Sequence, residues 1–281
     1  MPPPSEPPAD VVPLFEAERT RLIELLNGLT QSDWQRATPC PEWTVFGLVC
    51  HLLGGDFGLL ARRRDDHFGT PPPEGATEAE FIQWLDELQR DWVRAARRLS
   101  PRLVVDLLAW TMPQLAETLQ AEDPRAASAR VSWAGPQAVP VWLDQFRELS
   151  ECWIHRQQLH QALDLPSDLD PVVLRPILLA MRWAYPYRLR GVSAARGDTV
   201  RITITGPVTE NWLLAASGGN WDFEVEPGSR TVATLSLTTD QAWRLLSNNL
   251  PHAAHDDLDV SGDPRIVDVL LSTRAIIGSP K

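Results

Sequence analysis

Lysine and cysteine are scarce in this chain of 281 residues. Only one of its 26 basic residues is a lysine, Lys281, and only three cysteines occur, none of them in a Cys-x-x-Cys pair. Three cysteines without such a pair give no sign of a disulfide framework, and this scarcity is typical of a reducing compartment. Residues 1–10 also carry neither the basic nor the apolar part of a secretion signal. We therefore expect a cytoplasmic protein.

Excess positive charge and long apolar runs are also missing. The 37 acidic residues outnumber the basic ones and give a formal net charge of −11. Nucleic-acid binding needs clustered Lys and Arg that neutralise phosphates, so this charge argues against a nucleic-acid partner. No stretch reaches the ~18 consecutive apolar residues of a membrane span, which argues against a membrane partner. The remaining expectation is a small-molecule substrate.

Helical periodicity dominates residues 1–165. Apolar residues recur three, four and seven positions apart, and segments rich in Pro or Gly separate the runs. Two prolines stiffen segment 37–44 (ATPCPEWT), where Thr44 can cap the helix that follows. Short connections between such helices favour an antiparallel four-helix bundle. Helices are expected over residues 12–27, 45–64, 77–99, 101–119 and 141–163.

From residue 166 onward, short runs alternate apolar and polar residues, as half-buried strands do. The predicted fold class is therefore α + α/β in two domains, a four-helix bundle of residues 1–165 followed by a smaller α+β domain of residues 166–281. Strands are expected over residues 200–205, 221–226 and 232–237. Helices are expected over residues 171–187, interrupted at Pro176, and over residues 241–248 and 264–277, the last capped by Asp263.

The last helix of the bundle carries Glu151 and His155, a carboxylate and an imidazole four residues apart. At 3.6 residues per turn, both lie on one face of the helix, one turn apart, as metal chelation by a helix requires. The same spacing fits a charged face exposed to water, because the apolar residues of this helix lie on its opposite side. The pattern by itself leaves both interpretations open.

The second helix carries His51 on a face that also holds four glycines. Each glycine costs a helix interior ~1 kcal/mol relative to alanine, so four on one face indicate a close approach to the backbone, by another helix or by a ligand. We hypothesise that His51, Glu151 and His155 converge across the bundle. Such a set with one open position suits Zn²⁺, which could activate water or a thiol. The glycines are Gly47, Gly54, Gly55 and Gly58.

Two motifs resemble the mycothiol-dependent maleylpyruvate isomerase family, which is part of the DinB-like four-helix superfamily. The first is TPCPEWTV at residues 38–45, followed by HLLG at residues 51–54, and the second is ECWIH at residues 151–155. A third match is GDP at residues 262–264, upstream of Arg274. The resemblance covers the bundle and, more loosely, the C-terminal domain, which resembles the sterol-carrier-like module that these proteins append.

The resemblance implies a metal site and a thiol cofactor. The metal ligands of the family, a His on the second helix and a Glu and a His on the fourth, fall on His51, Glu151 and His155. An Arg near the end of the family's last helix helps to hold the anionic substrate, and Arg274 is our candidate for that role. The cofactors implied are Zn²⁺ and mycothiol or another low-molecular-weight thiol.

This chain departs from the family pattern after the second motif. Where the family usually reads His-Gly-Gln-Asp, this chain reads HRQQ at residues 155–158, so an expected carboxylate is a neutral amide. Gln158 lies on the face of Glu151, and we take it with Arg274 as a candidate catalytic residue. A carboxylate that orients an imidazole would then be missing, which changes the tuning of the metal. Thr273 also replaces the Gly that precedes the Arg.

The cysteines have a plainer interpretation. Cys50 and Cys152 adjoin candidate ligands in sequence but point roughly 100° away on their helices. We expect them to be buried small hydrophobic residues rather than nucleophiles. Cys40 lies in the loop before the second helix, and we expect packing there as well.

The sequence therefore predicts a zinc-dependent enzyme of the mycothiol-dependent isomerase or thiol S-transferase type. It would activate a thiol for addition to a small electrophilic, anionic substrate. A second hypothesis keeps the metal without the thiol and gives a hydrolase or cyclase of secondary metabolism. A third is a non-catalytic protein that binds an apolar small molecule. We expect a monomer, because two domains can enclose a cleft between them.

Overall fold

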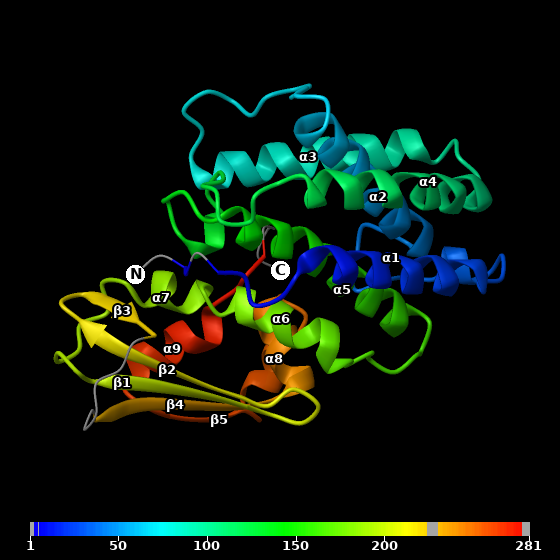
Figure 1. Ribbon diagram of the computed structural model, residues 1–281. Coiled ribbons are helices and arrows are strands. Elements are labelled where there is room, and N and C mark those ends of the chain that lie inside the picture. Colours follow the sequence, from blue (N-terminus) through cyan, green and yellow to red (C-terminus); the bar gives the residue numbers. More distant parts are fainter. Residues whose placement is uncertain (1–2, 5, 224–229, 277–281) are drawn as a thin grey trace.

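Figure 1 shows a computed structural model of the protein, which describes residues 3, 4, 6–223 and 230–276. The N-terminal part is helical and lies above the sheet in this view. Each of its long helices begins at or beside the residue expected from the sequence, and the Thr44 side chain accepts a hydrogen bond from the backbone of Gly47, as predicted. These helices are α1 (Val11–Asn27), α2 (Val45–Arg63), α3 (Glu78–Ala96), α4 (Pro101–Gln120) and α5 (Val141–Ala162).

Helix α2 is an inner helix of this part. It contacts α3, α4 and α5, and its apolar side chains Leu48, Val49 and Leu53 are buried. By length and composition α2 could cross a membrane, but half of that stretch is buried inside the protein. A core helix has the same composition, and the packing of α2 explains its apolar character.

Helix α5 is buried on both of its sides. Phe146 and Trp153 on the apolar side are fully buried, as the periodicity predicts. On the opposite side, His155 is only 9% exposed and Gln158 only 5% exposed. The alternative of a charged face exposed to water is therefore wrong for this half of the helix. The side chains of His155 and Gln158 face α2 and a segment of the C-terminal part instead of water, whereas Glu151 is only partly buried.

The C-terminal part contains a mixed sheet with the strand order β3-β2-β1-β4-β5. Strands β1 and β4 are parallel and all other neighbours are antiparallel. Alternate residues of β1 and β4 are buried, so one face of the sheet packs against the helices. The strands are β1 (Thr199–Thr205), β2 (Glu210–Ser217), β3 (Asn220–Asp222), β4 (Thr231–Thr238) and β5 (Asp259–Gly262). The helices are α6 (Pro171–Met181), α7 (Ala184–Leu189), α8 (Thr239–Leu246) and α9 (Pro264–Ser272).

Several details of this part differ from the sequence-based expectation. The single helix expected over residues 171–187 is two helices, and the break follows Met181 rather than Pro176, which lies inside α6. Strands β2 and β5 were not expected at all. The strand expected over residues 221–226 corresponds to β3, and residues 224–226 lie outside the described residues. Asp263 caps α9 as predicted, but the helix ends at Ser272.

The helices of the C-terminal part lie between the sheet and the N-terminal helices (Figure 1). Helices α8 and α9 contact β4, while α6 contacts α5 and α1. One cluster of buried apolar side chains runs through these layers and includes Trp153 of α5 and Trp243 of α8, whose rings meet edge to face at 5.3 Å. The N-terminal helices and the sheet thus share part of their core.

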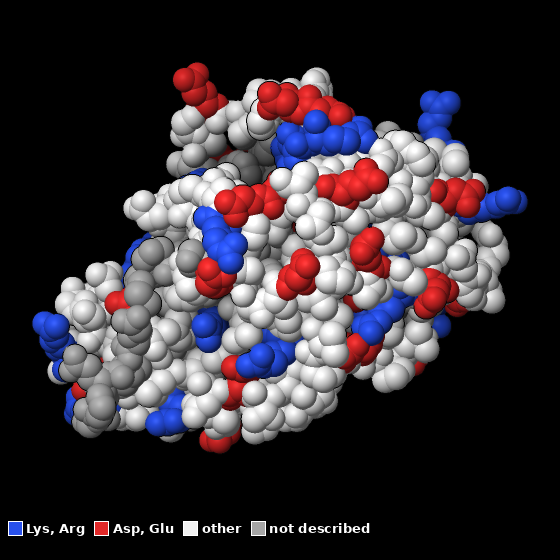
Figure 2. Space-filling model, viewed as in Figure 1, with Lys and Arg blue, Asp and Glu red and all other residues white. Residues whose placement is uncertain are grey.

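Acidic and basic side chains are interspersed on the surface that Figure 2 shows. Many of them form ion pairs, such as that between Arg21 of α1 and Asp170, the residue that caps α6, at 2.5 Å. Such pairs between α1 and the residue preceding α6 add polar contacts to the shared apolar core.

Candidate metal centre

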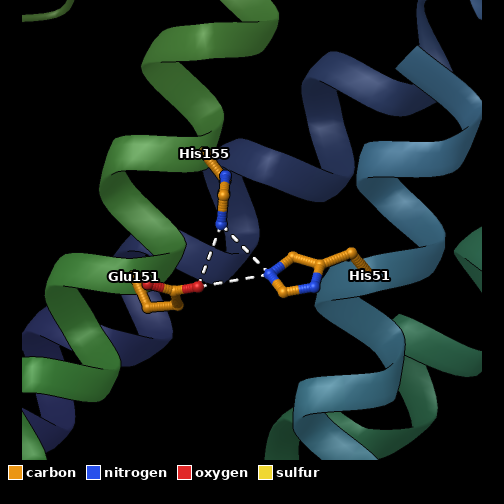
Figure 3. Close-up of side chains that lie close together, drawn as sticks. All are labelled: His51, Glu151 and His155. Carbon is orange, nitrogen blue, oxygen red and sulfur yellow. Dashed lines mark hydrogen bonds and ion pairs between the residues drawn. The ribbon is translucent and has the colours of Figure 1, made fainter. Parts of the chain in front are cut away.

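Three side chains meet between α2 and α5 (Figure 3). His51 comes from α2, and Glu151 and His155 lie one turn apart on α5. The Nε2 atom of His51 is 3.2 Å from Oε1 of Glu151 and 3.1 Å from Nε2 of His155. The Oε1 atom of Glu151 is 2.9 Å from Nε2 of His155. The structure therefore brings together the three residues that the sequence singled out.

The shape and chemistry of this triangle suit a metal ion. An ion with tetrahedral bonds of about 2.0–2.1 Å to nitrogen and oxygen holds neighbouring ligand atoms about 3.3 Å apart. All three ligand atoms lie within 4.8 Å of one another, with edges close to that value. The side chain of Glu151 is 41% exposed, against 12% for His51 and 11% for His155. Water and small molecules can thus approach from the side of the carboxylate.

The charges of the three groups are coupled. Burial opposes ionisation of Glu151, but the neighbouring imidazoles outweigh it and hold the pKa of the carboxyl well below its usual value. Burial also lowers the pKa of His155, but Glu151, with a further contribution from Cys40, outweighs it and raises the pKa to about 10. In the absence of a metal ion the two side chains of α5 form an ion pair. A cation that binds here would have to displace the proton of His155.

The ring of His51 is held from two directions. The indole of Trp43 stacks on it with ring centroids 4.6 Å apart, and Nδ1 lies 3.1 Å from Oε1 of Gln89 on α3. Trp43 belongs to the Pro-rich segment 37–44, which the Thr38 hydroxyl closes by donating to the carbonyl of Trp43 at 2.8 Å. That segment is therefore part of the site, beyond its role as a rigid connection.

The glycine face of α2 admits a neighbouring helix at one of its four glycines. A Cβ atom at Gly54 would overlap the indole of Trp92 on α3, and the Nε1 atom of that ring donates to the carbonyl oxygen of Cys50 at 2.7 Å. At Gly55 a Cβ atom would meet nothing. Of the two interpretations of this face, close approach of a helix holds at Gly54.

The Nδ1 atom of His155 lies 2.7 Å from Oε1 of Gln158. The same oxygen accepts a hydrogen bond from the Cys40 thiol, with the sulfur 3.2 Å away. An amide thus occupies the place where a carboxylate was expected, and it still orients the imidazole. Cys40 lies beside the site, whereas Cys50 and Cys152 are buried in the core as predicted.

Arg274 is outside this group of three. Its guanidinium donates to Oδ1 of Asn248 at 3.1 Å and to the carbonyl oxygens of Leu271 and Thr273, both at 2.8 Å. Asn248 precedes Asn249, whose side chain bonds to Gln158 at 2.9 Å. A short segment after α8 therefore contacts both Arg274 and the residue that orients His155.

Two residues at the site carried no signal in the sequence. Gln89 is one of several polar residues of α3, and Asn249 follows α8 in a polar segment. In the sequence, Gln89 lies 38 residues from its partner His51, and Asn249 lies 91 residues from its partner Gln158. Only the packing of α3 and α8 against the other helices brings them there.

Comparison with known proteins points to one family. The family model described as mycothiol maleylpyruvate isomerase N-terminal domain matches residues 15–160, which include α2 and all but the last two residues of α5. The crystal structures of the mycothiol-dependent maleylpyruvate isomerase and of a histidine-to-alanine mutant of it are similar, each with a TM-score of 0.54 over 90% of this chain and 93% of theirs, at 14% and 13% identity. No curated protein matches the chain. Because the family model spans more than half of the sequence, the chain belongs to the family of the mycothiol maleylpyruvate isomerase N-terminal domain.

Proposed function

We propose that this protein is a zinc-dependent enzyme that activates mycothiol, or another low-molecular-weight thiol, for addition to a small electrophilic and anionic substrate. The observation that carries the proposal is the convergence of His51, Glu151 and His155 from two helices with edges of 2.9 to 3.2 Å. Two imidazoles and one carboxylate are the ligand set of catalytic zinc sites that keep a position open. Membership of the isomerase family supports the same chemistry.

The chain's own residues have separable roles in this proposal. His51, Glu151 and His155 would hold the zinc ion, and a zinc ion with an open position favours the thiolate form of a thiol at neutral pH. Each imidazole points Nε2 at the centre and keeps Nδ1 on an amide oxygen, of Gln89 or Gln158. The exposed side of Glu151 gives the thiol and the substrate their access.

In the proposed reaction, the thiolate is the nucleophile that adds to the substrate. In an isomerase, its sulfur forms a bond to one carbon of a cis double bond, the resulting single bond rotates, and elimination of the thiolate restores the double bond in the trans form. In a transferase, the adduct gains a proton and leaves as the product. Arg274 is proposed to hold a carboxylate of the substrate, since it is partly exposed and its guanidinium bonds to Asn248, the neighbour of the residue that reaches Gln158.

The finer description of the architecture belongs to the same proposal. Residues 1–165 would form a DinB-like four-helix bundle and residues 166–281 a sterol-carrier-like domain. The protein would act in the cytoplasm as a monomer, with small molecules rather than nucleic acid or membranes as partners. The mixture of charges on the face in Figure 2 suits that choice of partner.

Metal content tests the centre of the proposal. Protein purified without chelators should hold about one zinc ion per chain by elemental mass spectrometry, as three ligands and an open position imply. The variants His51→Ala and Glu151→Ala should lose most of it while circular dichroism stays unchanged. His67→Ala, in an exposed loop, is the matched control and should keep its zinc. A parent protein that stays empty in excess zinc would overturn the proposal.

Dependence on thiol tests the reaction. Turnover of electrophilic acids with a cis double bond should require added thiol and should disappear in Glu151→Ala. Turnover that proceeds equally well without thiol would indicate the hydrolase or cyclase instead. An apolar molecule that co-purifies, together with no turnover of any electrophile, would indicate the non-catalytic binding protein.

A further inference from the structure

A series of hydrogen bonds runs from the backbone of the C-terminal part to His155. The Nδ2 atom of Asn249 bonds to the carbonyl oxygen of Ser247 at 2.9 Å and to its hydroxyl at 2.8 Å. The Oδ1 atom of Asn249 lies 2.9 Å from Nε2 of Gln158. The Oε1 atom of Gln158 lies 2.7 Å from Nδ1 of His155. Two side chains, those of Asn249 and Gln158, thus link a backbone carbonyl to the candidate metal ligand His155.

The carbonyl of Ser247, at the start of this series, determines which group donates and which accepts in every later bond. A backbone carbonyl can only accept, so the end of Asn249 that faces it must be the NH₂ group. The other end of Asn249 is then the oxygen, which requires an NH₂ group from Gln158. The oxygen of Gln158 therefore faces His155, and Nδ1 of that ring must carry a proton.

Other contacts agree with this direction. The Cys40 thiol donates to the same oxygen of Gln158, as it could not to an NH₂ group. Asn249 is itself held by its backbone, whose N–H donates to the carbonyl of Arg244 at 2.7 Å. Asn248 adopts the left-handed conformation, with φ of 59°, which ends α8 and turns the chain toward α5. The series is therefore anchored on a rigid turn.

We propose that Asn249 is a positioning residue of the metal centre, which fixes the proton of His155 on Nδ1 and keeps the lone pair of Nε2 for the ion. The zinc part of this proposal rests on the proposed function, whereas the placement of the proton does not. For His51 the described residues offer no such anchor, since among them no second side chain bonds to Gln89. The C-terminal part thus controls one of the two imidazoles.

The experiment compares Asn249→Ala in two backgrounds. In the otherwise unchanged protein, the NH₂ group of Gln158 loses its acceptor, and only the weaker bond from the Cys40 thiol still favours one orientation of the amide. Zinc affinity, measured by competition with a chelator, should fall about tenfold, as for other partners that orient a metal-ligating imidazole. The Nδ1 proton of His155, observed by long-range ¹H–¹⁵N NMR, should exchange faster with water, with or without zinc. Asn211→Ala, an exposed asparagine on β2, is the matched control and should change neither.

The second background is Gln158→Glu. A carboxylate accepts through either oxygen, so it needs no partner to choose its orientation. In this background Asn249→Ala should change zinc affinity and proton exchange little.

The outcomes separate the two proposals. Equal losses of zinc affinity in both backgrounds would show that Asn249 only supports the fold, and no loss in either would show that it does not position His155. Both results would overturn the inference. A protein that binds no zinc would overturn the proposed function, and the exchange of the Nδ1 proton would still decide the role of Asn249.

Discussion

At Gly54 the indole of Trp92 occupies the space that a side chain on α2 would need. Gly54→Ala should therefore displace Trp92 and weaken its hydrogen bond to Cys50, and it should lower the free energy of unfolding by about 1–3 kcal/mol, as overpacking does. Gly55→Ala is the matched control, because a Cβ atom there meets nothing. It should raise that free energy by about 0.5–1 kcal/mol. Urea unfolding measures both, and equal stability of the two variants would contradict the close approach of α3.

The three thiols should differ sharply in reactivity. Burial raises the pKa of Cys50 and of Cys152 to about 12, so on the order of one molecule in 10⁴ carries either thiolate at pH 8. Cys40 is partly exposed in its loop. Brief treatment with iodoacetamide at pH 8, followed by peptide mass spectrometry, should modify Cys40 before the other two. In guanidinium chloride all three should react alike, and early modification of Cys152 in the folded protein would contradict its burial.

The residues of the triangle could be predicted from sequence because their positions repeat with the helix. Glu151 and His155 are one turn apart, and His51 lies in a motif that the family shares. The periodicity did not settle whether this face of α5 is exposed, because its polar residues also fitted a face in contact with water, yet Gln158 is buried. A helical wheel shows which residues share a face, but not which partner covers that face. Asn249 covers it here, from a segment with no pattern of its own.

Strand β5 depends on one residue of the third sequence motif. Gly262 has φ of 122°, and a Cβ atom there would overlap the carbonyl oxygen of Val232 and the backbone of Ala233 on β4. Gly262→Ala should lower the free energy of unfolding by about 1–3 kcal/mol and raise hydrogen exchange along β5. Ser261→Ala, on the same strand and exposed, should cost far less. A stable Gly262→Ala variant would contradict this close approach.

The motif at residues 262–264 thus has a structural explanation. Gly262 permits the approach to β4, Asp263 caps α9 and Pro264 is in its first turn. Two other strands of the sheet show what sequence periodicity detects. Strand β1 alternates and was predicted, whereas β2 carries the continuous apolar run of residues 212–216, three of which in a row are buried, and was missed. Such a run cannot be assigned to a strand by alternation.

At the scale of the whole molecule, the shared core predicts one cooperative unfolding event. Trp153 of α5 and Trp243 of α8 belong to the same cluster, so neither part can lose its structure without exposing the other. Calorimetry of the full chain should show a single transition. A fragment of residues 1–165 should bind a dye for exposed apolar surfaces and aggregate. Cooperative unfolding of that fragment as a soluble monomer would contradict the prediction, and it would support the division into two domains at residue 165.

The ribosome makes α5 well before it makes α8. Trp153 must therefore wait for Trp243, which is synthesised 90 residues later, before its side of the helix is covered. During that interval the nascent chain presents an apolar surface, and chaperones bind such surfaces. The same delay applies to the metal centre, because Asn249 leaves the ribosome later still. A half-made chain would thus contain all three ligands of the triangle, but Gln158, which orients His155, would still lack its bond to Asn249. The order of synthesis itself would then decide when the site matures.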